Sequence, residues 1–172
     1  MSRAETFERI MLPHLDAAHN LARWLTRNEQ DAQDVVQEAY LRAFRFFDGY
    51  RGGDGKAWLL EIVRNTCRTL HRRQSGGAAS VPFEETAQIP DTAAASPEET
   101  LAGREEIDML RNCIDALPDE FREVLVLREL EEMSYRDIAE ATSLAIGTVM
   151  SRLSRARKRL QDCADRRKEA VK

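Results

Sequence analysis

The feature that most constrains the fold of this chain is a stretch of 27 residues, Gly76–Ala102, that contains no lysine or arginine. It holds three of the five prolines and five acidic residues, and it opens on a run of small residues. No helical or strand periodicity continues through it, so we expect a flexible acidic linker at 76–102. The rest of the 172-residue chain then forms two segments, 1–75 and 103–172, each large enough for only a small core.

The first segment has the apolar periodicity of helices. Apolar residues recur at spacings of three and four from Phe7 to Leu25, with a break at Pro13. Asn28 is a candidate N-cap for a second helix, and a third is expected from about Ala57 to Arg73. We expect a loop at 48–56, because four of the eight glycines fall there.

The second segment reads as four helices. Pro118 separates the first from the second, and Ser134 opens a short third helix as part of a capping box. A turn at 143–147 precedes a fourth helix from Thr148 to about Leu160. A short helix, a tight turn and a longer helix predict a helix-turn-helix. The predicted fold class is therefore all-α, with two small helical domains.

The fourth helix of the second segment has the pattern of a DNA-reading helix. An apolar stripe runs along one side, formed by Val149, Leu153, Ala156 and Leu160. The opposite side carries hydroxyl and basic residues: Ser151, Ser154, Arg155 and Lys158, flanked by Arg152, Arg157 and Arg159. Arginine can read guanine edges in the major groove, while serine and lysine hold phosphates. The alternative interpretation is that this basic side is simply exposed to solvent and binds nothing. The short helix and turn that precede it favour DNA reading instead.

The third helix of the first segment is a second candidate for nucleic-acid binding. Its polar side carries Arg64, Arg68, His71 and Arg72, with Asn65 at the edge, and no acid occurs between residues 64 and 73. Aromatic residues beside a basic stripe suit stacking on unpaired bases. Tyr50, next to Arg51 in the glycine-rich loop, is the stacking candidate, whereas we expect Phe47 in the core.

The second helix has the opposite charge. Its outward side carries Asp34, Gln37, Glu38 and Leu41, with Asp31 adjacent. Leu41 is therefore expected to be an exposed apolar residue among acids. Such a residue is a candidate anchor for a basic partner helix.

Several other functions find no support in the sequence. Cys67, Cys113 and Cys163 form no C-x-x-C pair, so we expect three reduced thiols in a cytoplasmic protein and no metal site. No apolar run reaches the roughly 18–20 residues of a membrane span, so no membrane insertion is expected. Motifs for a cofactor or for catalysis are also missing, and we expect no enzyme.

Three stretches together resemble the bacterial RNA polymerase sigma factors of the extracytoplasmic-function (ECF) group. Residues 31–44 are similar to the polymerase-binding helix of sigma region 2, and residues 56–65 to the start of the helix that reads the −10 element. Residues 117–153 look like sigma region 4. The resemblance covers nearly everything except the linker and the last dozen residues.

The resemblance implies specific roles. Residues that dock on the clamp helices of the polymerase β′ subunit would be Asp31, Asp34, Gln37, Glu38 and Leu41. The loop 48–56 would capture a flipped base, and −10 DNA would be bound by Tyr50, Arg51, Arg64, Asn65, Arg68 and Arg72. The −35 element would be read by Thr148, Ser151, Arg152, Arg155, Lys158 and Arg159. Further partners implied are the polymerase β flap and an anti-sigma factor, with a monomer when free.

The chain departs from the family pattern in two places. The glycine-rich loop is short, with no aromatic residue just before Lys56, and position 150 is Met where relatives often carry Lys or Arg. One alternative is a stand-alone helix-turn-helix regulator with an N-terminal sensor or dimerisation domain. The two partner-type faces of the first segment argue against that alternative.

The net charge of −4 is unevenly distributed. Residues 1–75 hold 12 bases and 10 acids, residues 76–102 hold five acids, and residues 103–172 hold 14 bases and 15 acids. The acidic chain as a whole repels DNA, although it carries two basic helices. We therefore expect it to bind promoter DNA chiefly when polymerase adds further attraction for the DNA.

Overall fold

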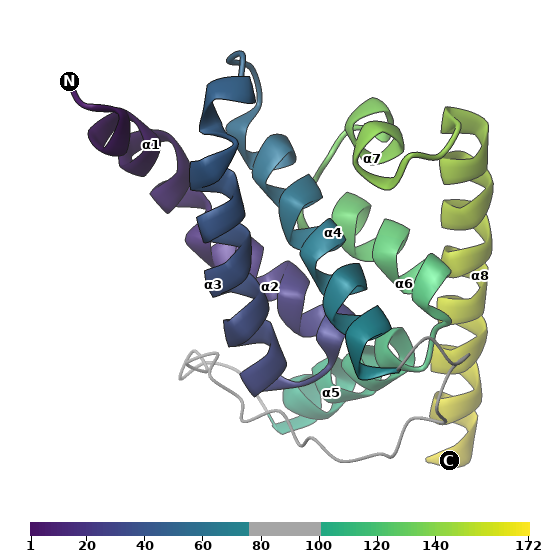
Figure 1. Cartoon of the computed structure of the whole chain (residues 1–172). Helices are drawn as coiled ribbons and strands as arrows, with labels where there is room; N and C mark the ends of the chain where they lie inside the picture. Colours follow the sequence, from purple (N-terminus) through teal and green to yellow (C-terminus); the bar gives the residue numbers. More distant parts are fainter. Residues whose placement is uncertain (76–100) are drawn as a thin grey trace.

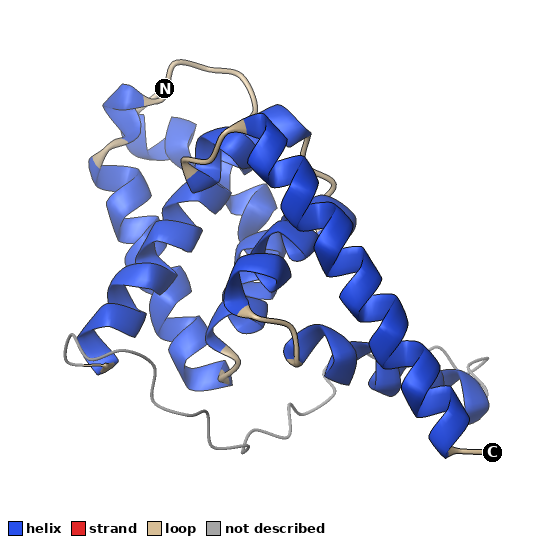
Figure 2. Cartoon of the chain, turned by 90° about the vertical axis from the view of Figure 1, so that its right-hand side faces the viewer, coloured by secondary structure: helices blue, strands red, loops and turns tan. Residues whose placement is uncertain are grey.

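The computed structural model describes residues 1–75 and 101–172, and these residues form helices without a strand (Figures 1 and 2). The first part contains α1 (Arg3–Met11), the 3₁₀ turn η1 (Leu12–His14), α2 (Leu15–Thr26), α3 (Glu29–Arg45), the 3₁₀ turn η2 (Phe47–Gly49) and α4 (Gly55–Gln74). The second contains α5 (Leu101–Asp115), α6 (Asp119–Leu125), the π-helical stretch η3 (Val126–Leu130), α7 (Tyr135–Thr142) and α8 (Ile146–Ala170). The all-α prediction is confirmed.

Local sequence signals account for the helix boundaries in the first part. Pro13 lies in η1, where the apolar pattern predicted a break between two helices. Arg27 ends α2 in the left-handed region at φ 60°. The Asn28 side chain then accepts a hydrogen bond from the backbone N–H of Asp31, which confirms the predicted cap of α3.

The expected linker at 76–102 lies almost wholly outside the described residues. Its last two positions, Leu101 and Ala102, belong to α5 instead. The final helix is also longer than expected, since α8 begins at Ile146 and continues to Ala170 rather than ending near Leu160.

The two parts of the chain pack against each other and share one cluster of buried residues (Figure 1). α2, α3 and α4 pack together in the first part, and α8 packs on α5, α6 and α7 in the second. Between the parts, α7 lies against α4 and α6 against α2. In the first part, Leu59, Leu60 and Val63 of α4 are completely buried. In the second part, Leu127 of η3 and Ile138 of α7 are completely buried as well.

The expectation about the cysteines is wrong. Cys113 of α5 and Cys163 of α8 form a disulfide, with their Cα atoms 5.8 Å apart, so three reduced thiols are not what the structure holds. The pairing arises because α5 packs along α8 and brings together residues 50 positions apart. Cys67 is the free thiol, and burial raises its pKa to about 12. A thiol with that pKa is almost wholly protonated at neutral pH and is therefore a poor nucleophile.

Candidate nucleic-acid and partner-binding surfaces

The helix-turn-helix is formed by α7 and α8. Ser134 accepts a hydrogen bond from the backbone N–H of Asp137 at 3.0 Å, which starts α7 as the capping pattern predicted. Ser143 ends α7 in the left-handed region at φ 58°. The turn therefore covers 143–145, shorter than the expected 143–147, and Gly147 already lies in the first turn of α8.

The expected two-sided pattern of α8 is confirmed. Val149, Leu153 and Ala156 are buried, and Leu160 is half-buried. The exposed side carries Thr148, Ser151, Ser154, Arg155 and Lys158. The rigid helix thus places these polar groups on one continuous surface, where they can reach base edges and phosphates together.

Two of the predicted −35 residues are partly held by α6. Arg152 is half-buried, with its Nη2 3.9 Å from Oε2 of Glu120. The guanidinium of Arg159 lies 4.7 Å from the ring centre of Phe121. Both contacts fix the outer edge of the α8 surface, and the DNA-reading role of these residues stays a prediction.

The predicted −10 surface on α4 is only partly exposed. Asn65, Arg68 and Arg72 face solvent, but Arg64 is 6% exposed. Its guanidinium forms an ion pair with Glu123 of α6, with Nε donating to Oε1 and Nη2 3.5 Å from Oε2. The packing of the second part on the first therefore buries the Arg64 guanidinium, while the other predicted −10 residues of α4 stay exposed.

A group of aromatic rings supports the glycine-rich loop. Tyr50 stacks on Phe47 with ring centres 5.8 Å apart, and its ring lies 5.2 Å from that of Trp58. The Tyr50 hydroxyl donates to the carbonyl of Gly53 at 2.8 Å. Phe47 is buried, as expected. Tyr50 thus contributes to internal packing, and its predicted role in base stacking stays untested.

Phe46, just before the loop, has an exposed side chain, at 59%. It borders a hollow of about 280 Å³ beside the loop, which is lined by Phe46, Gly49, Trp58, Glu61, Ile62 and Asn65. Planar rings with an adjacent amide and carboxyl can stack on a base and bond to its edge. The prediction missed this hollow. The sequence did contain a signal for it, namely three aromatic residues within positions 46–50. One small core cannot bury all three rings, so at least one of them should be exposed.

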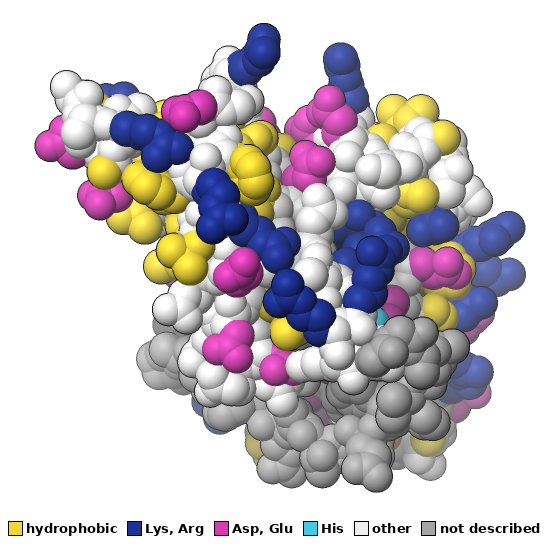
Figure 3. Space-filling view, viewed as in Figure 1, with side chains coloured by type: hydrophobic (Ala, Val, Ile, Leu, Met, Phe, Trp, Pro, Cys, Tyr) yellow, Lys and Arg dark blue, Asp and Glu magenta, His cyan; other side chains and the backbone are white. Residues whose placement is uncertain are grey.

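The outward face of α3 is the third surface. Leu41 is 62% exposed, and Asp34, Gln37 and Glu38 around it are exposed as well, which confirms the predicted arrangement. Asp31 is half-buried and accepts a hydrogen bond from Gln74 of α4 at 3.3 Å. Figure 3 shows basic side chains running across the side of the molecule that α3 and α4 present, beside exposed apolar ones.

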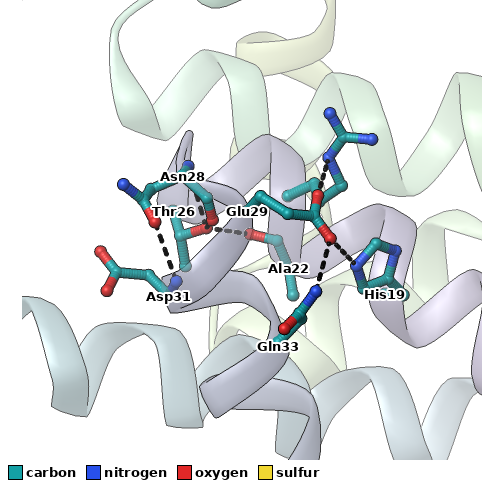
Figure 4. A network of polar contacts seen from close by, with 8 residues as sticks. His19, Ala22, Thr26, Asn28, Glu29, Asp31 and Gln33 are labelled. Atoms are coloured by element: carbon teal, nitrogen blue, oxygen red, sulfur yellow. Dashed lines mark hydrogen bonds and ion pairs between the residues drawn. The ribbon is translucent and has the colours of Figure 1, made fainter. Parts of the chain in front are cut away.

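A polar network fixes the start of α3 against α2 (Figure 4). Glu29 accepts hydrogen bonds from His19 at 2.9 Å and from Gln33 at 3.2 Å, and it pairs with Arg23 at 2.9 Å. Burial acts to raise the pKa of Glu29, but the Gln33 and His19 hydrogen bonds and the Arg23 charge lower it below its ordinary value. The network therefore holds α3 and its acidic face in a defined orientation.

Two further observations concern the described residues, 1–75 and 101–172. None of their helices combines the length and apolar character that crossing a membrane requires. No three of their histidine, cysteine and acidic side chains are arranged to hold a metal ion.

In the described residues, a helix-turn-helix whose second helix has a hydroxyl-rich and basic outer side is typical of a DNA-binding protein. The family model for sigma-70 region 2 matches residues 10–76, and that for sigma-70 region 4 matches residues 107–160. Region 2 accounts for the first part of the chain, so the stand-alone regulator is not favoured.

Curated relatives are similar along most of the chain. The ECF RNA polymerase sigma factor SigE of Mycolicibacterium smegmatis is 31% identical over 91% of this chain, which spans 61% of that protein's length. The ECF RNA polymerase sigma-E factor of Haemophilus influenzae is 32% identical, with 83% of this chain and 78% of the relative covered. RNA polymerase sigma-H factor of Pseudomonas aeruginosa is 33% identical, with 88% and 82% covered.

Solved structures extend the similarity to the fold. The sigma factor RpoE of Bartonella quintana, crystallised with the anti-sigma factor NepR, has a TM-score of 0.77 at 28% identity, covering 94% of this chain and 98% of that one. CnrH, in complex with the cytosolic domain of CnrY, has a TM-score of 0.67 at 26% identity, covering 94% and 89%. This chain belongs to the ECF RNA polymerase sigma factors.

Proposed function

We propose that this chain binds core RNA polymerase through the outward face of α3 and directs it to promoters by reading DNA with α4 and α8. Residues 1–75 form the region that binds polymerase and the −10 element, residues 76–102 the connection, and residues 103–172 the region that binds the −35 element. The observation that carries the proposal is Leu41, which is 62% exposed among Asp34, Gln37 and Glu38. An exposed apolar anchor beside Asp34 and Glu38 suits a partner helix that carries basic residues.

The DNA contacts divide between two surfaces. Ser151, Arg155 and Lys158 on α8 would enter the major groove of the −35 element. Arg68 and Arg72 on α4 would hold the −10 strand, and the hollow beside Phe46 would receive an unstacked base. Strand opening is supported by this second surface, because base capture requires an unpaired strand.

A hollow of about 280 Å³ supports a contact between the second part and the polymerase β flap. It lies between α5, η3 and α8 and is lined by Leu110, Leu125, Glu129, Arg157, Leu160, Gln161 and Ala164. Its leucines can bury an apolar side chain of a partner, while Glu129 and Arg157 border it with charge.

The chain acts in the cytoplasm by binding rather than catalysis, as a monomer when free, and an anti-sigma factor controls it. The similarity to RpoE supports this control, because RpoE was solved in complex with the anti-sigma factor NepR. Such a partner would compete with polymerase for the exposed α3 face.

Run-off transcription with purified core polymerase tests the proposal, combined with co-purification on core. Leu41→Asp should abolish co-purification and reduce transcript at least about tenfold, since the substitution removes the apolar anchor and leaves a charge that must be desolvated at the contact. Leu130→Asp is the matched control, because Leu130 is also an exposed leucine, at 44%, in η3. Unchanged co-purification of the Leu41 variant, or tight sequence-specific binding to duplex DNA without polymerase, would contradict the proposal.

A further inference from the structure

The contact between the two parts of the chain contains a matched pair of ionic contacts. Lys56 and Arg64 are eight positions apart on α4, and their partners Glu131 and Glu123 are also eight positions apart in the second part. Lys56 pairs with Glu131 and Arg64 with Glu123, so the two segments run antiparallel at this contact. Equal spacing lets both pairs form together.

Lys56 is 31% exposed, whereas Glu131 is nearly closed to solvent. Its side chain is 5% exposed, and its Oε2 lies 3.3 Å from Nζ of Lys56. The same Nζ donates to the backbone carbonyl of Glu131 at 2.8 Å. Asn20 of α2 donates to Oε1 of Glu131 at 2.8 Å. Glu131 thus binds two helices of the first part at once.

The Glu123 side is similarly enclosed, with Arg64 at 8% and Glu123 at 12% side-chain exposure. Arg64 also donates to Oδ1 of Asn65 at 3.3 Å, so the contact reaches a second residue of the predicted −10 surface. Midway between the two ionic contacts, Leu60 and Leu127 are completely buried. A charged group enclosed in this way is unavailable to any other ligand until the contact opens.

We propose that Glu123 and Glu131 form an internal latch, in which their carboxylates occupy the positions on Arg64 and Lys56 that DNA phosphates would take. This rests on the proposed function, together with the −10 roles that the family resemblance implies for Arg64 and for the loop ending at Lys56. Closed, the chain presents α3 and α8 but withholds the centre of α4. Opening releases two cations for the −10 strand.

The same contact contains a group that favours opening. Glu61 of α4 lies near Glu140 of α7, and burial together with this like charge raises the pKa of Glu61. Two negatively charged carboxylates on opposite sides of the contact repel each other, and this repulsion opposes closure of the two parts. The latch therefore combines two attractive pairs with one repulsive pair, which suits a closure that polymerase binding can reverse.

The test measures opening and DNA binding on the full chain without polymerase. Spin labels are attached at exposed Gln33 of α3 and Asp162 of α8 after their replacement by cysteine. The native cysteines do not compete under non-reducing conditions, because Cys67 is buried and the other two are paired. The probe for binding is a mixed-sequence single-stranded 20-nucleotide DNA.

Glu123→Gln and Glu131→Gln, alone and combined, should lengthen the label distance and raise single-strand affinity at least about fivefold. The slope of log K against log salt should steepen by about 0.7 for each cation released, or about 1.4 for both. Glu105→Gln is the matched control, because Glu105 is exposed on α5 of the second part and the variant removes the same single charge outside the two ionic contacts. It should change neither quantity.

An unchanged distance in the double variant would overturn the latch, as would opening without a gain in affinity or an equal gain in the Glu105 variant. Circular dichroism confirms that each variant is folded. If a variant does not fold, the charge exchange Arg64→Glu with Glu123→Arg replaces it, and this exchange should restore the closed distance without restoring DNA binding. Failure of transcription with core polymerase would instead refute the sigma function, and it would leave the distance measurement intact.

Discussion

Reduction of the Cys113–Cys163 disulfide should destabilise the protein strongly. The bond closes a loop with a sequence separation of 50, from the end of α5 to the second half of α8. In the chain-entropy model, cross-linking a loop of about this length removes about 14 cal/mol/K from the unfolded ensemble, which is about 4 kcal/mol at 25 °C. The two parts of the chain share a core, so we treat them as one unfolding unit. For a protein of this size, each kcal/mol changes Tm by about 2–4 °C, and we expect Tm to fall by about 8–16 °C.

Thermal unfolding followed by circular dichroism, with and without reductant, measures this loss. Thiol titration of the unfolded chain defines the two states, with one reactive thiol before reduction and all three cysteines after it. The double variant Cys113→Ala with Cys163→Ala is the control, and its Tm should not depend on reductant. Three reactive thiols in the mildly oxidised protein would show that the bond does not form. Equal Tm values for fully oxidised and fully reduced protein would refute the entropic argument.

Three further changes test the surfaces. Arg155→Ala should cost about 1–3 kcal/mol at one base position of the −35 element in competition assays, whereas an equal loss on every sequence would indicate a phosphate contact. Phe46→Ala should lower single-strand affinity by about 1–3 kcal/mol with little change in Tm, because the ring is 59% exposed; unaltered affinity would remove Phe46 from the stacking surface. Glu61→Gln should stabilise the protein at neutral pH. Burial and Glu140 raise the pKa of Glu61 above its ordinary value of 4.5 in the folded chain, so ionisation costs stability as the pH rises through and above that value. The gain should disappear at about pH 3.5, where both folded and unfolded chains carry the neutral acid, and a gain of the same size at both pH values would contradict this cause.

Much of the candidate site follows from periodicity alone. The buried stripe and the polar side of α8 were predicted, because a helix repeats every 3.6 residues and separates the two sets regardless of its neighbours. The exposure of Leu41 followed for the same reason. The caps at Asn28 and Ser134 are local hydrogen bonds within three residues, which sequence reasoning can find without knowing the rest of the fold.

Other features depend on which helices meet. Periodicity placed Arg64 on the polar side of α4, yet it is 6% exposed, because Glu123 of another helix covers it. The disulfide escaped prediction in the same way, since spacing along the chain says nothing about the packing of α5 on α8. Phe46 and Trp58 border a hollow that forms only when η2 folds back beside α4.

The sequence by itself determined that this chain is helical, that it has two basic helices and one acidic face, and that it resembles the sigma factors. These properties are encoded by residues within a few turns of each other. Only the tertiary structure decided that the two parts close on one another and that Lys56 and Arg64 are held by Glu131 and Glu123. Those contacts join residues 75 and 59 positions apart. Their formation depends on the packing of whole helices, a balance of burial and charge that no local pattern records.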